Sequence, residues 1–314
     1  MTVYRTCVTG PFPRTEELVQ ATRDLDRGRI TVPAGEAAFA KAESEVAAVE
    51  GRLELDVRTG GYLRWADMFR PFTEIWRGVS AGTLTRNFET NTFYRQPIFE
   101  RPPKESGGKL GRWLPDPATS RAILPGPYTF RKMSEVQYAP TDSNAPIEHI
   151  AEAMAAELSS LGARVPRQVQ FQEPMLVYDP PRGDVPELRR AYQRLASALP
   201  AATKILWTYF GDVAPAWPLL SRLPVDVVGF DLFESSLEAG EKIPGRGLGV
   251  GCIDSRSTVR EETGEVARLV RAAVRPLAPE TVWLGPSPPL DLLPFTAAAE
   301  KLELLPALRT ELAR

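Results

Sequence analysis

Acidic side chains end several apolar segments of this chain, at positions where parallel strands place polar residues. Glu173 follows the apolar run at 165–171, Asp231 ends the segment VVGFD, and Asp254 ends GVGCID. A partly desolvated carboxylate at such a position can act as a general acid or base, or hold an ammonium group or a metal ion. The same side chains could instead cap loop amides or a helix N-terminus. The residue pattern leaves both interpretations open.

Basic and polar side chains near other predicted strand ends could bind a substrate. Arg14 follows GPFP, and Asn91 and Arg95 lie in FETNTFYRQP. A fixed guanidinium group suits carboxylates and phosphates, although either arginine could equally form a surface salt bridge. Further candidates at predicted strand ends, or in the loops after them, are Tyr62, Asp67, Tyr128, Gln172, Tyr209, Arg256 and Ser287.

These candidates divide into two predicted roles. We assign acid–base catalysis to Tyr209 and the three carboxylates Glu173, Asp231 and Asp254. We assign substrate binding to Arg14, Asn91, Arg95, Tyr128, Gln172, Arg256 and Ser287.

The chain offers few side chains that bind transition metals, because it has one histidine and two cysteines. His149 stands at the start of an amphipathic segment, where we expect an ordinary helix residue. Cys252 lies near a strand end, but an isolated cysteine in an apolar segment is commonly a small buried hydrophobe, and Cys7 has the same setting. We therefore predict no metal site. An unfamiliar ligand set of Cys252, Asp231 and Glu173 stays open.

Composition and missing motifs exclude several classes of protein. A net charge of −2 gives no electrostatic reason to expect nucleic acid or an anionic membrane as a partner, and no apolar run approaches the ~20 residues of a membrane span. The start of the chain lacks a secretory signal, and two separated cysteines fit a reducing compartment. We expect a cytoplasmic protein. The sequence also lacks a GxxxxGK[ST] loop, a GxSxG elbow and an HExxH helix.

The second half of the sequence alternates predicted strands and helices. Strands are expected at 165–171, 204–209, 225–230, 248–253 and 282–284, and helices at 186–199 and after the capping-box spacing of Thr258 and Glu261. This alternation indicates a parallel sheet covered on the outside, whose active face is formed by the loops after the strands.

The first half is less regular. We expect helices at 15–26 and 37–53, an extended segment at 55–59, and a Gly/Pro-rich excursion at about 100–121 over the mouth of the sheet. No linker or repeat divides the chain. We predict one α/β domain over residues 1–314, folded as a single closed β/α barrel.

Six segments, in order along the chain, resemble the cobalamin-independent methionine synthase family. They are GPFPRTEEL at 10–18, FETNTFYRQP at 88–97, GPYTF at 126–130, QEPMLVYD at 172–179, WTYFGDV with LPVDVVGFD within 207–231, and LGPSPPLDLLP at 284–294. The resemblance implies a (β/α)8 TIM-type barrel of the kind shared with uroporphyrinogen decarboxylase. The chain looks closer to the zinc-less N-terminal half of the full-length enzymes than to their zinc-bearing C-terminal half.

The resemblance also implies an altered zinc site. The family's C-terminal half holds zinc through a His-x-Cys pair, an acidic residue and a second cysteine. The matching positions here carry Trp207, Tyr209 and Asp231, and the stretch at 286–289 has no cysteine. Gln172 also replaces an aspartate that precedes the family's Glu-Pro motif. On this basis neither zinc nor another bound cofactor is expected.

Two functions are consistent with this pattern. In the first, the chain is a methyltransferase component of methionine biosynthesis. It binds 5-methyltetrahydrofolate or homocysteine, with Arg14, Asn91 and Arg95 as carried-over binding residues, and works with a separate zinc-bearing barrel subunit. In the second, the barrel serves a metal-free group transfer or lyase reaction through its carboxylates. A non-enzymatic binding or scaffold role is a third option. Carboxylates with shifted pKa values in a pocket would favour the second function, and an apolar outer patch would favour the first.

Overall fold

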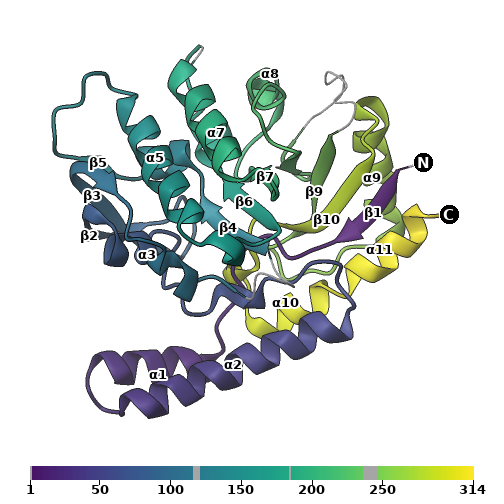
Figure 1. The fold of residues 1–314 in the computed structure, drawn as a ribbon. Coiled ribbons are helices and arrows are strands. Elements are labelled where there is room, and N and C mark those ends of the chain that lie inside the picture. The colour runs from purple at the N-terminus through teal and green to yellow at the C-terminus, as the bar shows by residue number, and fades with distance from the viewer. Residues whose placement is uncertain (1, 116–120, 184, 236–245) are drawn as a thin grey trace.

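The computed structural model describes residues 2–115, 121–183, 185–235 and 246–314, and a curled parallel sheet forms its centre (Figure 1). The strands are β1 (Val3–Thr6), β4 (Arg121–Pro125), β6 (Gln168–Gln172), β7 (Thr203–Trp207), β8 (Val227–Asp231), β9 (Gly247–Asp254) and β10 (Thr281–Ser287). Their order is β1–β10–β9–β8–β7–β6–β4, and all neighbouring strands are parallel. The predicted parallel sheet of the second half is therefore confirmed.

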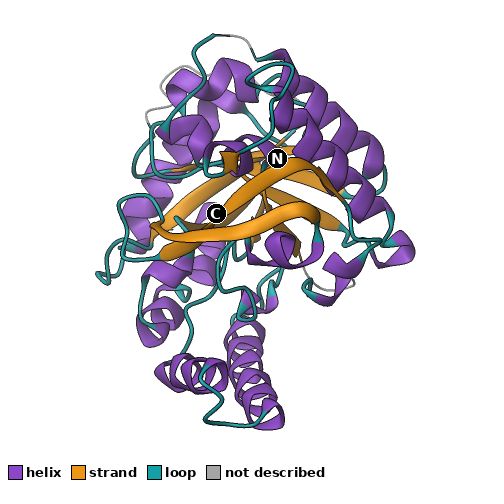
Figure 2. Cartoon of the chain, turned by 90° about the vertical axis from the view of Figure 1, so that its left-hand side faces the viewer, coloured by secondary structure: helices purple, strands orange, loops and turns teal. Residues whose placement is uncertain are grey.

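Helices cover the outer face of this sheet (Figures 1 and 2). The longer ones are α5 (Ala145–Ser159), α7 (Pro186–Ala198), α9 (Thr263–Leu277) and α11 (Leu304–Leu312). Short helices lie at or near the strand ends, namely α4 (Pro127–Lys132), α6 (Met175–Tyr178), α8 (Trp217–Leu220) and α10 (Phe295–Lys301).

The sheet has a separate apolar core on each face. Side chains of a strand alternate between the two faces, and Val169, Leu206 and Val228 belong to the large cluster that packs against the helices. Ile205 and Val227, which alternate with them, belong to a smaller cluster with Cys7, Val57, Trp207, Tyr209 and Trp283. The smaller cluster therefore fills the concave interior of the sheet.

Trp207 is the more deeply buried of the two tryptophans in that interior cluster, with 1% exposure against 6% for Trp283. Its ring lies over Gly229 of β8 and Gly249 of β9. A Cβ atom added at either glycine would come within 2.4 Å of the indole, which is closer than real contacts permit. The neighbouring strands must therefore carry glycine where the ring crosses them.

The predicted closed eight-stranded barrel was wrong, because the seven-stranded sheet forms an open half-barrel. Between its edge strands, β1 and β4, lies the extended segment at 55–59. Val57 makes one isolated parallel bridge with Cys7, and the amide of Arg121 donates to the carbonyl of Arg58 (3.0 Å). The segment contacts both edges, but it is too short for a full ladder because helix α2 (Val32–Arg52) ends just before it and a 3-10 turn starts at Gly60.

The first half adds two structures outside this sheet. Helices α1 (Glu16–Asp26) and α2 pack together as an arm that projects from the body (Figures 1 and 2). After α3 (Arg70–Ile75), strands β2 (Arg77–Arg86) and β3 (Phe93–Lys104) form an antiparallel hairpin, which joins β5 (Glu135–Val136) in a second sheet. Part of the excursion predicted at 100–121 therefore belongs to β3, and residues 116–120 lie outside the described residues.

The predicted capping box at Thr258 and Glu261 was also wrong. Helix α9 starts at Thr263, and its N-cap is Glu262 without a side-chain hydrogen bond. Glu261 instead accepts a hydrogen bond from the amide of Asp254 (2.9 Å) and pairs with the buried Lys301 (2.8 Å). A tertiary ion pair therefore takes the carboxylate that the local pattern assigned to the helix end.

Glu173, directly after β6, fixes the start of α4. It is fully buried and accepts hydrogen bonds from the amides of Tyr128 (3.0 Å) and Thr129 (2.7 Å) and from the hydroxyl of Tyr192 (3.0 Å). Burial raises the pKa of Glu173 to about 7, against the opposing effect of these hydrogen bonds. Gly126 makes room for the carboxylate, because an added Cβ would lie 2.1 Å from the Glu173 carboxyl carbon.

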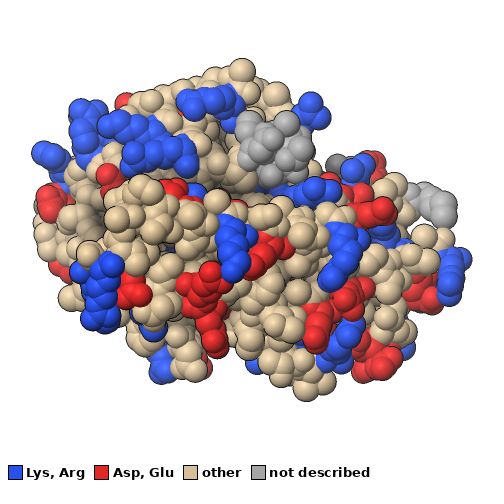
Figure 3. Space-filling view, turned by 90° about the horizontal axis from the view of Figure 1, so that it is seen from below, with Lys and Arg blue, Asp and Glu red and all other residues tan. Residues whose placement is uncertain are grey.

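Acidic and basic side chains are both spread over the face shown in Figure 3, as the small net charge suggests. Among the described residues, no helix is long and apolar enough to cross a membrane.

The Trp207 packing predicts opposite effects for two glycine substitutions. Gly229→Ala should lower the free energy of unfolding by about 1–3 kcal/mol, because the added methyl group overpacks the interior. The methyl group of Gly264→Ala in α9 would meet no described atom within 4 Å beyond its chain neighbours and the nearby helix backbone. This variant should be neutral or stabilising by up to about 1 kcal/mol. Urea denaturation of both variants measures the difference. Equal effects would show that Trp207 does not constrain the neighbouring strands.

We call the Glu173 carboxylate and its three donors, the amides of Tyr128 and Thr129 and the hydroxyl of Tyr192, the clamp of α4. The clamp predicts a pH-dependent effect for Glu173→Gln. The unfolded carboxyl group loses its proton near pH 4.5, and the folded one near pH 7. The folded protein therefore binds more protons in this interval, and the wild type loses stability as the pH rises through it. The variant lacks this titration. The NH2 of its side-chain amide would also face a backbone N–H, so two donors would meet and one hydrogen bond would be lost. The variant should therefore be destabilised by about 1–3 kcal/mol at pH 5.

At pH 8 the deficit of Glu173→Gln relative to wild type should be smaller. Urea denaturation at the two pH values gives the comparison, and Glu300→Gln on the exposed side of α10 is the control. A deficit that is the same at both pH values would contradict the raised pKa.

Candidate functional site

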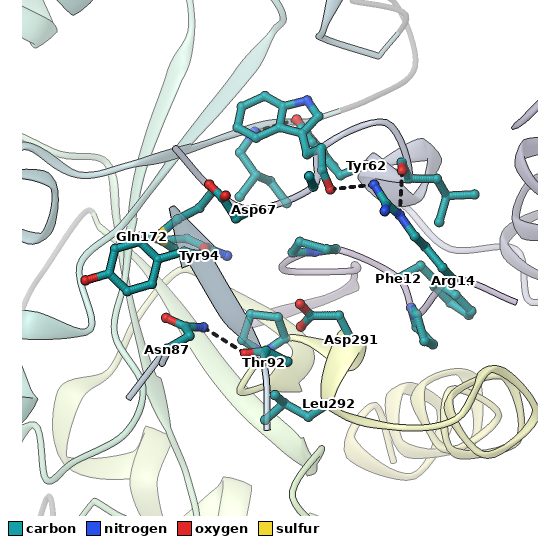
Figure 4. A pocket seen from close by; sticks show the side chains of 18 of the residues that line it. Phe12, Arg14, Tyr62, Asp67, Asn87, Thr92, Tyr94, Gln172, Asp291 and Leu292 are labelled. Atoms are coloured by element: carbon teal, nitrogen blue, oxygen red, sulfur yellow. Dashed lines mark hydrogen bonds between the residues drawn. The ribbon is translucent and has the colours of Figure 1, made fainter. Parts of the chain in front are cut away.

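A pocket of about 370 Å³ opens at the carboxyl ends of the central strands (Figure 4). Its walls come from the loop after β1, the segment at 62–68, the ends of β4 and β6, and the loops after β7 and β10. The β2–β3 hairpin forms the remaining wall through Asn87, Thr92, Phe93 and Tyr94. This volume lies in the range of small-molecule sites, and the position is where barrel-type folds bind ligands.

Arg14 is the cation of this pocket. Its Nε donates to the carbonyl of Leu63 (2.8 Å) and its Nη2 to that of Trp65 (3.0 Å), so the guanidinium group is held in place by backbone (Figure 4). Burial and the nearby Arg70 lower the pKa of Arg14, while carboxylates including Asp291 and Asp67 oppose the change. Among the described residues, none of these carboxylates lies within ion-pair distance of it. The structure thus places Arg14 in the lining of the pocket at the mouth.

Two carboxylates of the pocket differ in their freedom to bind a ligand. Asp67 accepts hydrogen bonds from the amides of Phe69 (2.8 Å), Arg70 (2.8 Å) and Arg95 (3.1 Å), so its oxygens are largely engaged. Asp291, after β10, is accessible from the pocket. Protein nevertheless surrounds it on the concave wall, and this desolvation raises the pKa of its carboxyl group to about 6, against the opposing effect of its own amide and of Arg14.

Gln172 and Tyr209 form the floor of the pocket. The Tyr209 hydroxyl donates to Oε1 of Gln172 (3.0 Å), and Nε2 of Gln172 donates to the carbonyl of Thr9 (3.0 Å). Burial raises the pKa of Tyr209 well above its usual value, and the charge of Asp291 adds to the effect. The hydroxyl is therefore a fixed donor and is poorly suited to act as a base.

Aromatic rings supply most of the apolar surface around these polar groups. The rings that line the pocket are those of Phe12, Tyr62, Trp65, Phe93, Tyr94, Tyr209 and Phe210. The site therefore combines flat apolar walls, one cation and one accessible carboxylate.

A second group of predicted residues gathers outside the pocket lining, at the ends of β8 and β9. Arg256 lies 3.3 Å from Oδ2 of Asp231 and 2.7 Å from Oδ1 of Asp254, and it also contacts Glu234. Asp231 is buried, and its Oδ2, although within ion-pair distance of Arg256, accepts no hydrogen bond from the described residues. Burial raises the pKa of Asp231 to about 7, although Arg256 opposes the shift. Ser287, paired in register with Asp254, is also buried, and its hydroxyl has no hydrogen-bond partner within the part of the chain that the structure describes.

The remaining predicted residues lie apart from both groups. Tyr128, like Glu173, belongs to the buried clamp of α4, and its hydroxyl donates to the carbonyl of Asp179 (3.0 Å); burial raises the pKa of Tyr128 to about 12. Asn91 and Arg95 lie on the hairpin instead of a strand end of the central sheet. Arg95 is exposed and donates to the carbonyl of Gly82 (3.3 Å), and Asn91 accepts from Arg86 (3.2 Å). The periodic pattern did not reveal this hairpin.

The side chains at the implied zinc positions do not fit a zinc ion. The indole of Trp207 has no lone pair to give, and its ring fills the sheet interior. The Tyr209 hydroxyl is bonded to Gln172. Cys252 alternates with the interior positions and belongs to the cluster under the helices. Among the described residues, no group of three His, Cys, Asp or Glu side chains could hold a metal ion. His149 lies in α5, where Nδ1 contacts the Tyr138 hydroxyl (2.8 Å).

Sequence reasoning missed Asp291, Asn87 and Thr92. Asp291 lies in the segment LGPSPPLDLLP, seven residues after the strand predicted at 282–284, and that position could have marked it as a mouth residue. Asn87 and Thr92 face the pocket only because the hairpin folds back over the mouth, and no local signal predicts that fold.

Comparison with known proteins places the chain in a family. Residues 72–277 match the family described as cobalamin-independent synthase, N-terminal domain. A 5-methyltetrahydropteroyltriglutamate–homocysteine methyltransferase of Nitratidesulfovibrio vulgaris (strain Miyazaki F) is 30% identical over 260 residues, covering 71% of this chain and 32% of the relative. The enzyme of that name from Mycobacterium tuberculosis is 33% identical over 207 residues, covering 60% of this chain and 27% of the relative.

Solved structures share the whole fold. A B12-independent methionine synthase from Shewanella sp. W3-18-1, in complex with selenomethionine, aligns with a TM-score of 0.73 at 15% identity and covers 99% of this chain and 98% of that one. A putative vitamin-B12-independent methionine synthase from Listeria monocytogenes aligns with a TM-score of 0.70, also at 15% identity, over 99% and 98% of the two chains. At this identity the likeness concerns the fold alone.

The chain spans about a third of the length of the curated relatives it matches. The family match covers about two thirds of the chain and includes the whole β2–β3 hairpin and five strands of the central sheet, namely β4, β6, β7, β8 and β9. This protein therefore belongs to the cobalamin-independent methionine synthase family, as a chain related to the family's N-terminal domain.

Proposed function

We propose that this chain takes part in methyl transfer from 5-methyltetrahydropteroyltriglutamate to homocysteine, as the folate-binding component of methionine biosynthesis. The names of its relatives supply the reaction. The observation that supports a role for this chain is the pocket at the mouth, where aromatic walls surround Arg14 and the accessible carboxylate of Asp291.

The chemistry of a methylfolate matches these groups. Its flat pterin ring can stack against aromatic walls. The 2-amino-4-oxopyrimidine edge presents adjacent N–H donors, and one carboxylate can accept hydrogen bonds from both. Asp291 is the carboxylate available for this, because the oxygens of Asp67 already accept three backbone amides. The glutamate tail brings carboxylates that a fixed guanidinium group binds well. In this proposal Arg14 binds the carboxylates of the glutamate tail. Arg95 and Asn91, which are exposed on the hairpin, do not line the pocket.

Activation of the homocysteine thiol is assigned to a separate zinc-bearing barrel subunit. Zinc sites of this kind use Cys and His ligands, and Trp207 and Tyr209 stand in the corresponding positions here. The chain would hold the methyl donor while the partner presents the thiolate. A cytoplasmic location fits both this role and the two free, buried cysteines.

A second function, metal-free group transfer or lyase chemistry, has one specific observation in its favour. Asp231 is buried beside Arg256, and burial raises its pKa to about 7. Its Oδ2 accepts no hydrogen bond from any residue that the structure describes. Such a carboxylate can exchange a proton near neutral pH. The neighbouring Asp254 and Arg256 would then orient it.

Binding of 5-methyltetrahydrofolate triglutamate and monoglutamate, measured by isothermal titration calorimetry, tests the first function. Arg14→Gln should reduce the affinity advantage of the triglutamate, because the tail loses its cation. Asp291→Asn should weaken both forms by about 10–100-fold, as expected for loss of one charge-assisted hydrogen bond. Asp24→Asn on α1, at a position that does not line the pocket, should change neither affinity.

The same titrations carry a pH signature. The pterin donors bind the ionised form of Asp291, so the wild-type affinity should fall as the pH drops below about 6, and Asp291→Asn should lack this fall. Failure of the folded wild type to bind either folate would refute the folate-binding role. Methionine formed from homocysteine by the chain alone, with zinc added, would refute the need for a partner.

A further inference from the structure

The mouth pocket lies between two structures that are separate in the fold. Its floor and most walls belong to the central sheet and its loops, whereas Asn87, Thr92, Phe93 and Tyr94 belong to the β2–β3 hairpin of the second sheet. The position of the hairpin therefore determines how open the pocket is.

Hydrogen bonds hold the base of the hairpin to the body. Asp67 accepts from the amide of Arg95 (3.1 Å), the hydroxyl of Tyr94 donates to the carbonyl of Met133 (3.2 Å), and β3 pairs with β5 through Ile98 and Phe99. The base is thus fixed from Tyr94 onward along β3.

The tip of the hairpin, residues 87–92, is closed on itself. The amide of Asn87 donates to the carbonyl of Thr92 (2.9 Å), the side chain of Asn87 donates to the Thr92 hydroxyl (3.1 Å), and the Thr90 hydroxyl donates to the carbonyl of Asn87 (2.6 Å). Among the described residues, the hydrogen bonds of the tip stay within the hairpin. The tip is therefore a preformed unit that can move against the body.

Ring contacts join this tip to the body. The Phe88 ring lies 4.8 Å from that of Phe210, in the loop after β7, and 5.1 Å from that of Tyr178, at the end of α6. Both distances are those of favourable aromatic pairs. Phe210 also packs edge-on against Tyr209 at 4.9 Å and lines the pocket itself. The contact therefore lies between the pocket floor and the tip of the hairpin.

The two phenylalanines that meet here both have left-handed backbone. Their φ angles are +52° for Phe88 and +67° for Phe210. For a bulky side chain this conformation is strained, and such strain is kept only where the surrounding contacts enforce it. The turns that contain Phe88 and Phe210 therefore hold the two rings in place at this contact.

We infer that the β2–β3 hairpin is a gate of the mouth pocket and that the Phe88–Phe210 contact is its latch. Passage of a ligand requires the two rings to separate while the base of the hairpin stays bonded. The ligand would be the methylfolate of the proposed function, and the inference rests on that function only for the identity of the ligand.

The test compares Phe88→Ala with Leu84→Ala in the otherwise intact chain. Leu84 is on the same hairpin and 63% exposed, and it does not line the pocket. Stopped-flow binding of 5-methyltetrahydrofolate triglutamate should show that Phe88→Ala raises both the association and dissociation rates, each roughly tenfold, a factor that corresponds to about 1.4 kcal/mol. Leu84→Ala should match the wild type. A change confined to the dissociation rate would overturn the gate and make Phe88 an ordinary binding residue.

A second readout needs no ligand. Trp65 lines the pocket, and acrylamide quenches tryptophan fluorescence that it can reach. The part of the quenching that comes from Trp65 is obtained by comparing each protein with its Trp65→Phe derivative. Phe88→Ala should increase that share several-fold, and the amides of residues 87–92 should exchange hydrogen faster. Unchanged quenching and exchange would overturn the latch. If the wild type binds no folate, the proposed function fails, and the quenching measurement still decides whether the hairpin is a gate.

Discussion

The packing of Trp207 inside the curled sheet constrains much of the structure around it. The indole takes the space that two neighbouring strands leave by carrying Gly229 and Gly249, since a single methyl group at either position would clash with the ring. Because the interior is filled in this way, the polar residues that follow it along the strands are confined to the mouth. The same ring occupies one of the positions at which the resemblance implies a zinc ligand, and an indole cannot serve as one.

The charges at the mouth separate into two groups with different surroundings. In the pocket, Arg14 is fixed by backbone carbonyls, and Asp291 remains accessible on the concave wall. At the ends of β8 and β9, Arg256 draws Asp231, Asp254 and Glu234 together outside the pocket lining. The pocket group suits recognition of a ligand with both donors and negative charge. In the Arg256 group, burial raises the pKa of Asp231 to about 7, a value suited to proton transfer. This supports the alternative function, metal-free group transfer or lyase chemistry.

Burial also decides what Glu173 does. Two backbone amides and one hydroxyl converge on its carboxylate, so it positions α4 at the edge of the mouth. A raised pKa alone would suggest an acid–base catalyst, yet the side chain is fully buried and does not line the pocket. Its contacts favour the structural interpretation, a carboxylate that caps loop amides.

The sequence by itself determined the parallel sheet of the second half, the mouth as the place for polar residues, and the family, because periodicity and motif order are local properties of the chain. It placed Arg14, Gln172 and Tyr209 at strand ends, where the pocket contains them. The sequence-based prediction failed where a distant segment decides what a residue contacts. Glu261 pairs with Lys301 instead of capping a helix. The segment at 55–59 contacts the edge strands β1 and β4 without forming a full strand. Tertiary structure alone brought the hairpin with Asn91 and Arg95 away from the central sheet, turned Asp291 toward the pocket and joined Phe88 to Phe210. Contacts between residues more than a hundred positions apart depend on the packing of the whole chain, and no local pattern encodes them.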